Sequence, residues 1–232
     1  MPTTMSEAPL VLDNGGCALK VGFPQDAGPQ VIPNCVAKAK GSRQWLTGDL
    51  LRDARDVSCL VLKRPIDRGY VVNWELQQDI WMHTFEKVLK VDPKGRSLLL
   101  TEPPMNLSAC RTSAEEIIFE GMGFSSMHTC TSAELSLPHF VASNMTKARP
   151  KQARTGLVLD CGFSFTHAVP IFDGNPITSA VRRINIGGKA ITNLLKEMVS
   201  YRSLNMMDEA YLMELVKNSV SFVSADPLAD LH

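Results

Sequence analysis

The chain has 232 residues, 44% of them hydrophobic and 21% charged, and its 24 basic and 24 acidic residues give a formal net charge of +0. This length and apolar content are enough to bury the core of one large domain or of two small ones. Because the charges balance, no broad attraction to nucleic acid or to an anionic membrane is expected, and sequence-specific DNA binding is not predicted. Proteins or small anions are the expected partners.

The cysteines and the first residues indicate the compartment. Six cysteines are scattered along the chain without a Cys-x-x-Cys pair or a close histidine. This spacing argues against a zinc site and a disulfide framework, and it favours a reducing environment. The chain does not begin with a basic segment followed by an apolar one, and no apolar run approaches the ~20 residues of a membrane span. We expect a soluble protein that is neither secreted nor held in a membrane.

The first predicted element is a strand that enters a glycine-rich turn. Apolar residues 10–12 lead into Asp13 and then Asn-Gly-Gly at 14–16, and a second strand over 18–23 is expected to return beside the first. The pattern recurs far downstream, where Leu-Val-Leu-Asp-Cys-Gly occupies 157–162. A repeat at that distance is too long for a solenoid and predicts two related lobes, each opening with a strand, an acidic residue and a glycine turn.

Two helices and a strand are predicted between the repeats. The first helix begins after Asn73 as its N-cap, and Pro93 is expected to end it. A short buried strand follows over 97–101. The second helix is predicted to begin at a capping box formed by Ser113 and Glu116.

A basic, proline-containing segment separates the two halves of the chain. We interpret residues 147–155 as a solvated linker, with a nuclear-import signal or a nucleic-acid patch as the alternatives. The predicted organisation is a first lobe over 1–146, this linker, and a partial second lobe over 156–232. Two amphipathic helices are expected in the second lobe, one opening at Gly187-Gly188 and one following Asp208.

The paired turns have a common chemistry. A glycine-rich turn exposes successive backbone N–H groups, which hold phosphate oxygens. Two such turns facing across a cleft would place Asp13 and Asp160 on either side of a hydrated magnesium ion, and Lys20 would bring a positive charge to the phosphates. The alternative is that both segments are ordinary hairpin turns, where these residue types are common. The duplication favours the nucleotide cleft.

The sequence resembles actin over nearly its whole length, from Leu10 to Asp226. Residues 10–23 are similar to the first phosphate loop of actin and 157–174 to the second. Within the actin superfamily, the chain is most similar to a nuclear class of actin-related proteins. The resemblance to the superfamily also rests on segments 65–74, 80–81, 99–106 and 183–189. The resemblance to the class rests on segments 31–35, 69–74, 162–167, 200–204 and 207–209.

The resemblance implies an α/β fold of the actin-like, ribonuclease H-like type, present here as the first lobe and the beginning of the second. It implies ATP or ADP with Mg²⁺ between the lobes, the metal being held through water by Asp13 and Asp160. For the nuclear class it implies a non-filamentous assembly subunit of an SWR-type chromatin remodelling complex, which exchanges a variant histone. The implied partners are a zinc-finger HIT-type protein and the remodelling ATPase. The residues expected to bind the nucleotide are Asp13, Asn14, Gly15, Gly16, Lys20, Asp160, Gly162 and Lys217.

Several positions depart from the actin pattern. Gly16 and Cys17 replace a serine and a glycine, so a hydroxyl contact to the terminal phosphate is absent. Phe163 replaces an acidic residue that orders the waters of the metal, and Ser132 replaces the glutamine that positions the attacking water. Lys217 matches a lysine beside the base, but the next residue is Asn218 instead of glutamate. Because positioning and charge stabilisation account for most of phosphoryl transfer, slow or absent ATP hydrolysis is expected.

Two further departures concern assembly. The segment from Pro33 to Gly48 is too short for the loop that joins actin subunits, so no homopolymer is expected. The sequence also ends soon after the second lobe begins, which predicts a shortened chain with uncovered apolar surface on its last helices. The resulting interpretation is a nuclear scaffold without enzymatic activity, with a cytoplasmic location left open. The alternative is a cytoskeletal actin-like ATPase that binds and hydrolyses ATP in the cytoplasm.

Overall fold

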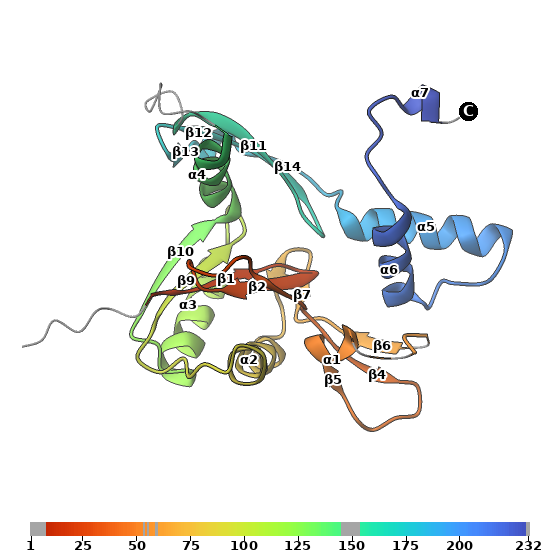
Figure 1. The fold of residues 1–232 in the computed structure, drawn as a ribbon, viewed down its shortest axis with the longest axis horizontal. Helices are drawn as coiled ribbons and strands as arrows, with labels where there is room; N and C mark the ends of the chain where they lie inside the picture. The colour runs from red at the N-terminus through yellow and green to blue at the C-terminus, as the bar shows by residue number, and fades with distance from the viewer. Residues whose placement is uncertain (1–7, 53, 55, 59, 145–153, 231–232) are drawn as a thin grey trace, which may run out of the picture.

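The fold begins with a five-stranded sheet in the order β10-β9-β1-β2-β3. Its strands are β1 (Leu10–Asn14), β2 (Ala18–Gly22), β3 (Gln30–Pro33), β9 (Ser97–Glu102) and β10 (Ser126–Thr131). The computed structural model describes residues 8–52, 54, 56–58, 60–144 and 154–230 (Figure 1). Strand β1 pairs in parallel with β9 and antiparallel with β2. The first predicted hairpin is therefore at the centre of this sheet.

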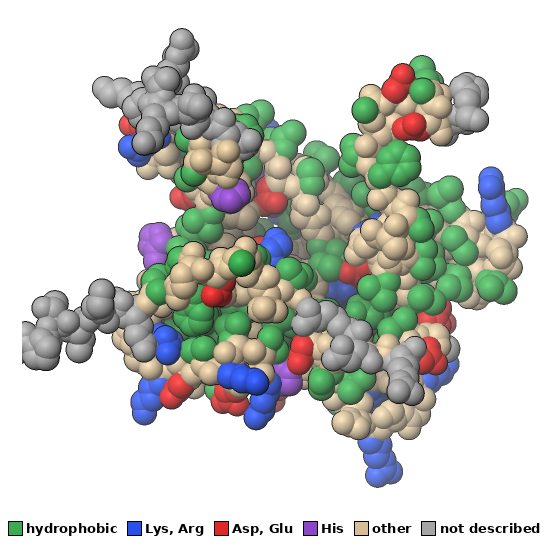
Figure 2. Space-filling model, viewed as in Figure 1, with side chains coloured by type: hydrophobic (Ala, Val, Ile, Leu, Met, Phe, Trp, Pro, Cys, Tyr) green, Lys and Arg blue, Asp and Glu red, His purple; other side chains and the backbone are tan. Residues whose placement is uncertain are grey.

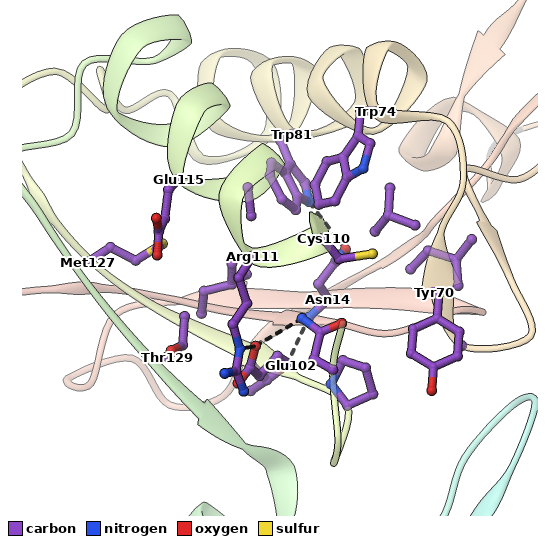
Figure 3. A pocket seen from close by; sticks show the side chains of 18 residues that line it. Asn14, Tyr70, Trp74, Trp81, Glu102, Cys110, Arg111, Glu115, Met127 and Thr129 are labelled. Atoms are coloured by element: carbon purple, nitrogen blue, oxygen red, sulfur yellow. Dashed lines mark hydrogen bonds and ion pairs between the residues drawn. The ribbon is translucent and has the colours of Figure 1, made fainter. Parts of the chain in front are cut away.

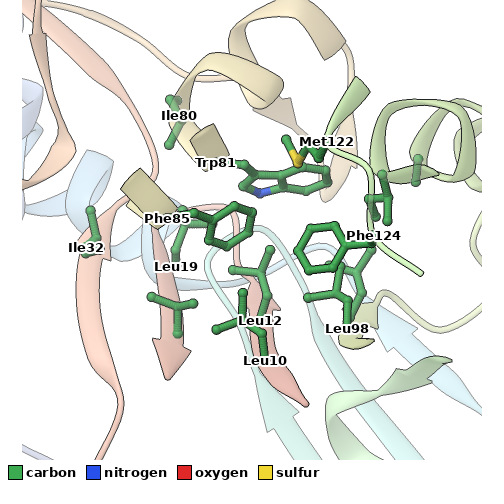
Figure 4. Close-up of a cluster of buried hydrophobic side chains, with 14 of the residues drawn as sticks. Leu10, Leu12, Leu19, Ile32, Ile80, Trp81, Phe85, Leu98, Met122 and Phe124 are labelled. Atoms are coloured by element: carbon green, nitrogen blue, oxygen red, sulfur yellow. The ribbon is translucent and has the colours of Figure 1, made fainter. Parts of the chain in front are cut away.

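Helices pack against one face of this sheet and complete a large core. Helix α2 (Trp74–His83) continues into the π-helical turn η1 (Thr84–Leu89), and α3 (Ser108–Glu116) continues into the π-helical turn η2 (Ile117–Gly121). Figure 4 shows the side chains of sheet and helices interleaved. The buried cluster consists of Leu10, Leu12, Leu19, Val21, Ile32, Val36, Ile80, Trp81, Phe85, Leu98, Leu100, Ala114, Ile118, Met122 and Phe124.

The start of α2 is as predicted, but two helix boundaries were wrong. The Asn73 side chain accepts a hydrogen bond from the Leu76 backbone N–H at 3.0 Å, as an N-cap should. The helical segment ends at Lys90, which adopts a left-handed φ of 55°, before Pro93 is reached. Helix α3 begins at Ser108 and runs through Ser113, so the predicted capping box is interior to the helix. Ser and Glu also occur inside helices, so this motif alone does not mark the start of α3.

A small three-stranded sheet and a hairpin extend from the first sheet. The strands are β4 (Val36–Ala39), β5 (Leu46–Thr47) and β6 (Leu60–Lys63), in the order β5-β4-β6, with α1 (Gly48–Arg52) following β5. The hairpin consists of β7 (Ile66–Asp67) and β8 (Tyr70–Val71). We call the elements from β1 to β10, with α1 to α3, the first lobe.

The second lobe, from α4 onward, opens with another sheet. Antiparallel β11 (Gly156–Cys161) and β12 (Thr166–Phe172) form the second predicted hairpin, which β13 (Asn175–Pro176) and β14 (Arg182–Ile184) extend, with the 3-10 turn η4 at Thr178–Ala180. Helix α4 (Ser132–Asn144) packs on this sheet. The small core consists of Ala133, Val169, Ile171 and Val181, with Leu137 and Val158 against it. The predicted linker at 147–155 lies mostly outside the described residues, and the predicted boundaries of the lobes at 146 and 156 stay a prediction. Helix α4 is grouped here with the second lobe because it packs on β11.

Three helices complete the described chain: α5 (Gly188–Arg202), α6 (Ala210–Val220) and α7 (Pro227–Asp230). The first two match the predicted amphipathic helices. Gly187 allows α5 to start against the second turn, since a Cβ there would lie 2.5 Å from the Phe163 carbonyl oxygen. The surface of α5 and α6 carries exposed apolar side chains, including Ile191, Leu194, Met198 and Val220 (Figure 2). Within the described residues, no helix combines the length and the apolar character that crossing a membrane requires.

Candidate nucleotide-binding cleft

The two glycine turns face one cavity of about 400 Å³ between the lobes. Figure 2 shows the molecule hollowed between these parts, with acidic and basic side chains near the hollow. Its volume is within the ~300–1,000 Å³ typical of ligand sites. The structure brings together all eight residues predicted to bind a nucleotide, since Asp13, Asn14, Gly15, Gly16, Lys20, Asp160, Gly162 and Lys217 all line this cavity. Their role in binding stays a prediction.

The carboxylate of Asp13 is held from two sides. Strand pairing puts Asp13 directly opposite Lys20, and the Lys20 ammonium lies 2.9 Å from Asp13 Oδ2. The hydroxyl of Thr101, from the neighbouring parallel strand β9, donates to Asp13 Oδ1 at 2.5 Å. The hydrogen bond with Asp13 raises the pKa of Lys20, with burial opposing that rise. Lys20 therefore stays protonated at neutral pH and keeps its contact with Asp13.

A buried polar cluster supports the first turn from within the core. The Asn34 side-chain amide donates to the Gly15 carbonyl at 2.9 Å and exchanges hydrogen bonds with Gln77, and the Trp81 indole donates to Asn14 Oδ1 at 3.2 Å. Asn34 and Gln77 are fully buried. Sequence reasoning missed both. The available signal was Gln77, which precedes Ile80 by three residues and Trp81 by four, and so puts a polar group on the apolar face of its helix.

A second, smaller cavity lies beside this cluster. Figure 3 shows Trp74, Trp81 and Tyr70 around it, with the Arg111–Glu102 ion pair at one side. Asn14 lines both cavities. The first turn is thus a wall shared by the cleft and the core of the first lobe.

The second turn holds its carboxylate differently. The Ser132 hydroxyl, at the start of α4, donates to Asp160 Oδ2 at 2.6 Å. The Gly162 backbone N–H is used within the turn, where it donates to the Phe165 carbonyl at 2.8 Å. That amide is therefore not free for a phosphate oxygen, so this turn offers fewer backbone N–H donors than the sequence predicted.

His167 lies directly opposite Asp160 in the β11–β12 pairing and lines the cavity. It is only 5% exposed, and its Nε2 atom is buried with no hydrogen-bond partner among the described residues. Burial lowers the pKa of His167, opposed by the nearby charge of Asp160 and assisted by Arg183. A buried nitrogen without a partner costs free energy. It therefore marks a place where a polar group fits.

Lys217 reaches the cavity from α6 and is already bonded. Its ammonium donates to Thr192 Oγ1 at 3.0 Å and to the Gly188 carbonyl at 3.3 Å. Among the described residues, no cluster of three or more histidine, cysteine or acidic side chains could ligate a metal directly. Asp13 and Asp160 would hold a magnesium ion through its water shell, and the donors present fit a hydrated cation.

Comparison with known proteins decides the family. The family model for actin matches residues 4–230. The chain belongs to the actin family. It is 46% identical over 225 residues to Actin-related protein 6 of Oryza sativa subsp. indica, covering 96% of this chain and 52% of the relative. Identity is 43% over 228 residues with Actin-related protein 6 of Arabidopsis thaliana, and 37% over 224 residues with that of Drosophila melanogaster; each match covers 96% of this chain, and 54% and 56% of those relatives.

These comparisons confirm the family and the actin-like α/β fold predicted from the sequence. The chain spans about half the length of the curated relatives that it matches. It is similar along nearly all of its own length to actin-related proteins, which is the class of actin-family protein that the sequence predicted.

Two positions where this member of the actin family departs from actin have a defined structural setting. The Phe163 ring lies against the first turn, because a Cβ at Gly16 would meet Phe163 Cδ1 at 3.6 Å. The Ser132 hydroxyl, at the position where the resemblance predicts the loss of a glutamine, is bonded to Asp160. The apolar ring of Phe163 and the bonded hydroxyl of Ser132 thus both line the cavity.

Proposed function

We propose that the full-length protein is a nuclear, non-filamentous assembly subunit of an SWR-type chromatin remodelling complex that exchanges a variant histone. Its actin-family cleft would hold ATP or ADP with Mg²⁺ as a structural ligand. The observation that carries this proposal is the combination of a cleft lined by both aspartates and Lys20 with Phe163 and Ser132 at the positions that serve hydrolysis in actin. A zinc-finger HIT-type protein and the remodelling ATPase are the proposed partners.

The retained groups support binding of a polyphosphate. Asp13 is fixed by Lys20 and Thr101, and Asp160 by Ser132. Two ordered carboxylates on opposite sides of one cavity suit a hydrated divalent cation, and the cation would neutralise the charge of the phosphates. Lys20 would supply a positive charge, and Lys217 would lie near the base.

The replaced groups argue against hydrolysis. Attack on the terminal phosphate requires a water that is oriented by a hydrogen-bonding side chain and activated by the surrounding charge. The Phe163 ring has no hydrogen-bonding group, and the Ser132 hydroxyl is short and bonded to Asp160 at 2.6 Å. The bound nucleotide would therefore stabilise the two lobes without being turned over, since a ligand that binds only the folded state stabilises it.

Purification of the full-length protein under native conditions tests the nucleotide part of the proposal. Chromatography of the released nucleotide should detect ADP or ATP, and phosphate release should remain at background. The Asp160→Ala variant should lose the nucleotide. Steady phosphate release that Asp160→Ala abolishes would contradict the proposal and favour the actin-like ATPase. The double variant Phe163→Asp with Ser132→Gln restores the acidic side chain and the glutamine that actin has at these positions. Its rate of phosphate release should then rise above that of the unmodified protein.

Identification of co-purifying proteins tests the assembly part. A tagged full-length protein should lie in the nucleus and co-purify with remodeller subunits, and it should remain in the supernatant after centrifugation in magnesium and salt. Cytoplasmic filaments, or recovery with filament-binding proteins, would favour the cytoskeletal alternative.

A further inference from the structure

Helix α6 joins the second lobe to the small sheet of the first. Figure 1 shows α6 above β4, β6 and α1. Tyr211 is only 6% exposed and packs in the core of that small sheet with Cys35, Ala37 and Leu51. Glu214 is three residues further on, on the same face of α6, and it is also buried. One helix of the second lobe therefore contributes both an apolar and an acidic side chain to the first lobe.

Among the described residues, Glu214 bonds to two side chains of the first lobe. Arg64, between β6 and β7, lies 2.8 Å from Glu214 Oε2, and the side chains of Arg64 and Glu214 are only 17% and 10% exposed. The Cys17 thiol, in the first glycine turn, donates to Glu214 Oε1 at 2.6 Å. Both carboxylate oxygens are thus satisfied away from solvent, the condition under which removing one partner of an ion pair is strongly destabilising.

Arg64 also binds the backbone of the first turn. Its guanidinium donates to the carbonyls of Cys17 at 3.1 Å and Gly16 at 3.4 Å. The guanidinium also lies over the Phe163 ring, whose centroid is 4.9 Å from the guanidinium carbon. Arg64 therefore contacts both glycine turns and α6, and it fixes the direction in which the peptide groups of the first turn point.

We infer that Arg64, Glu214 and Cys17 form an interlobe latch, which closes the cleft in the absence of any ligand and positions the first glycine turn. Closure of a hinged cleft usually requires binding energy from its ligand. Here buried contacts within the protein supply it, since the latch and Tyr211 bridge the lobes on the side of the cleft formed by α6 and the small sheet. Slow nucleotide release is a second consequence, and that part alone rests on the proposed function.

The protonation of Cys17 is consistent with this role. Burial, the charge of Glu214 and the hydrogen bond to it raise the pKa of Cys17 to about 12. The thiol therefore remains a protonated donor at physiological pH. Because the thiolate is the reactive form of cysteine, the latched thiol should react slowly with alkylating agents.

The test uses the full-length protein and two matched variants. Glu214→Gln keeps the shape of the side chain and removes the charge from the buried pair. Lys189→Gln breaks another interlobe ion pair, in which Lys189 Nζ lies 3.4 Å from Asp67 and both side chains are more than half exposed, so it should have little effect. Alkylation by iodoacetamide without nucleotide is followed at Cys17 by peptide mass mapping, with the exposed Cys161 as the internal reference.

Glu214→Gln should accelerate Cys17 alkylation relative to Cys161, and Lys189→Gln should not. Removing one charge of a buried ion pair is expected to cost more than about 1.4 kcal/mol, the free energy that corresponds to a factor of ten. Release of a fluorescent ADP analogue should therefore be at least about tenfold faster in Glu214→Gln. The double variant Arg64→Glu with Glu214→Arg exchanges the two charges and should restore part of the slow alkylation of Cys17. Such a recovery would show that Glu214→Gln breaks the latch and does not misfold the protein.

Two results would overturn the latch: unmodified Cys17 reacting as fast as Cys161 in the nucleotide-free protein, or Glu214→Gln behaving like Lys189→Gln. If the unmodified protein binds no nucleotide, the proposed function fails on that point. The alkylation measurements still decide the latch in that case.

Discussion

The two glycine turns share a sequence pattern but differ in what stands behind them. The first turn is backed by a large core and by the buried amides of Asn34 and Gln77. The second turn belongs to a sheet with a smaller core. Helix α4 covers one face of that sheet, while Leu157 and Leu159 on the other face are each 65% exposed. A repeated motif therefore specifies the groups that face the cleft, whereas their rigidity depends on packing that the motif does not encode.

Removal of Trp81 should produce the largest effect. Trp81 is 1% exposed, and it donates to Asn14. Trp81→Ala is expected to lower the free energy of unfolding by about 3–5 kcal/mol, whereas Ile171→Val in the second core should cost about 0.5–1.5 kcal/mol. Urea denaturation of the full-length protein measures both. Because the two substitutions remove side chains of different size, the contradicting outcome is a loss well below about 3 kcal/mol for Trp81→Ala, which would mean that Trp81 is not packed in the first core.

The hydroxyl that holds each aspartate provides a matched pair of substitutions. Thr101 donates to Asp13 and accepts from the Asn14 backbone N–H at 3.1 Å, so Thr101→Val removes two hydrogen bonds from a residue that is 8% exposed. The expected loss is about 1.5–3 kcal/mol, because one of these bonds goes to a charged group. Thermal unfolding in the presence and absence of ADP and Mg²⁺ should show a lower midpoint in both conditions.

Ser132→Ala is the counterpart on the second turn. It removes a single hydrogen bond, to the carboxylate of Asp160 in part-buried surroundings, and should cost about 1.5 kcal/mol, the lower end of the range for a bond to a charged group. Calorimetric titration with ADP and Mg²⁺ should show a smaller loss of affinity for Ser132→Ala than for Thr101→Val. A larger loss for Ser132→Ala would mean that the second turn carries more of the binding than its packing indicates.

The smallest predicted effect is a pH dependence that comes from His167. Because burial lowers the pKa of His167 in the folded state, the unfolded chain takes up the proton first as the pH falls. His167 therefore contributes stability above its ordinary pKa near 6.5, and this contribution is lost progressively on acidification below that value. His167→Gln should flatten the melting temperature between pH 7.5 and about 5.5. An unchanged slope in the variant would assign the dependence to other groups.

Much of the fold could be predicted from the sequence because it depends on local pattern. The hairpins at 10–22 and 156–172, the N-cap at Asn73 and the two helices of the second lobe all followed from apolar periodicity and turn residues. The predicted capping box at Ser113 failed because the same residue types also occur inside helices, and α3 already begins at Ser108.

The sequence alone determined the family, the pair of Asp-x-Gly turns and eight of the residues that line the cleft, since short motifs and family resemblance can be read from the order of residues. Only the tertiary structure decided what each of these residues contacts. Arg64 and Glu214 are 150 residues apart in the chain, and Asn34 and Gln77 are 43 apart. Such pairs form because folding brings distant elements into one desolvated space, and neither residue carries a local signal that identifies its partner.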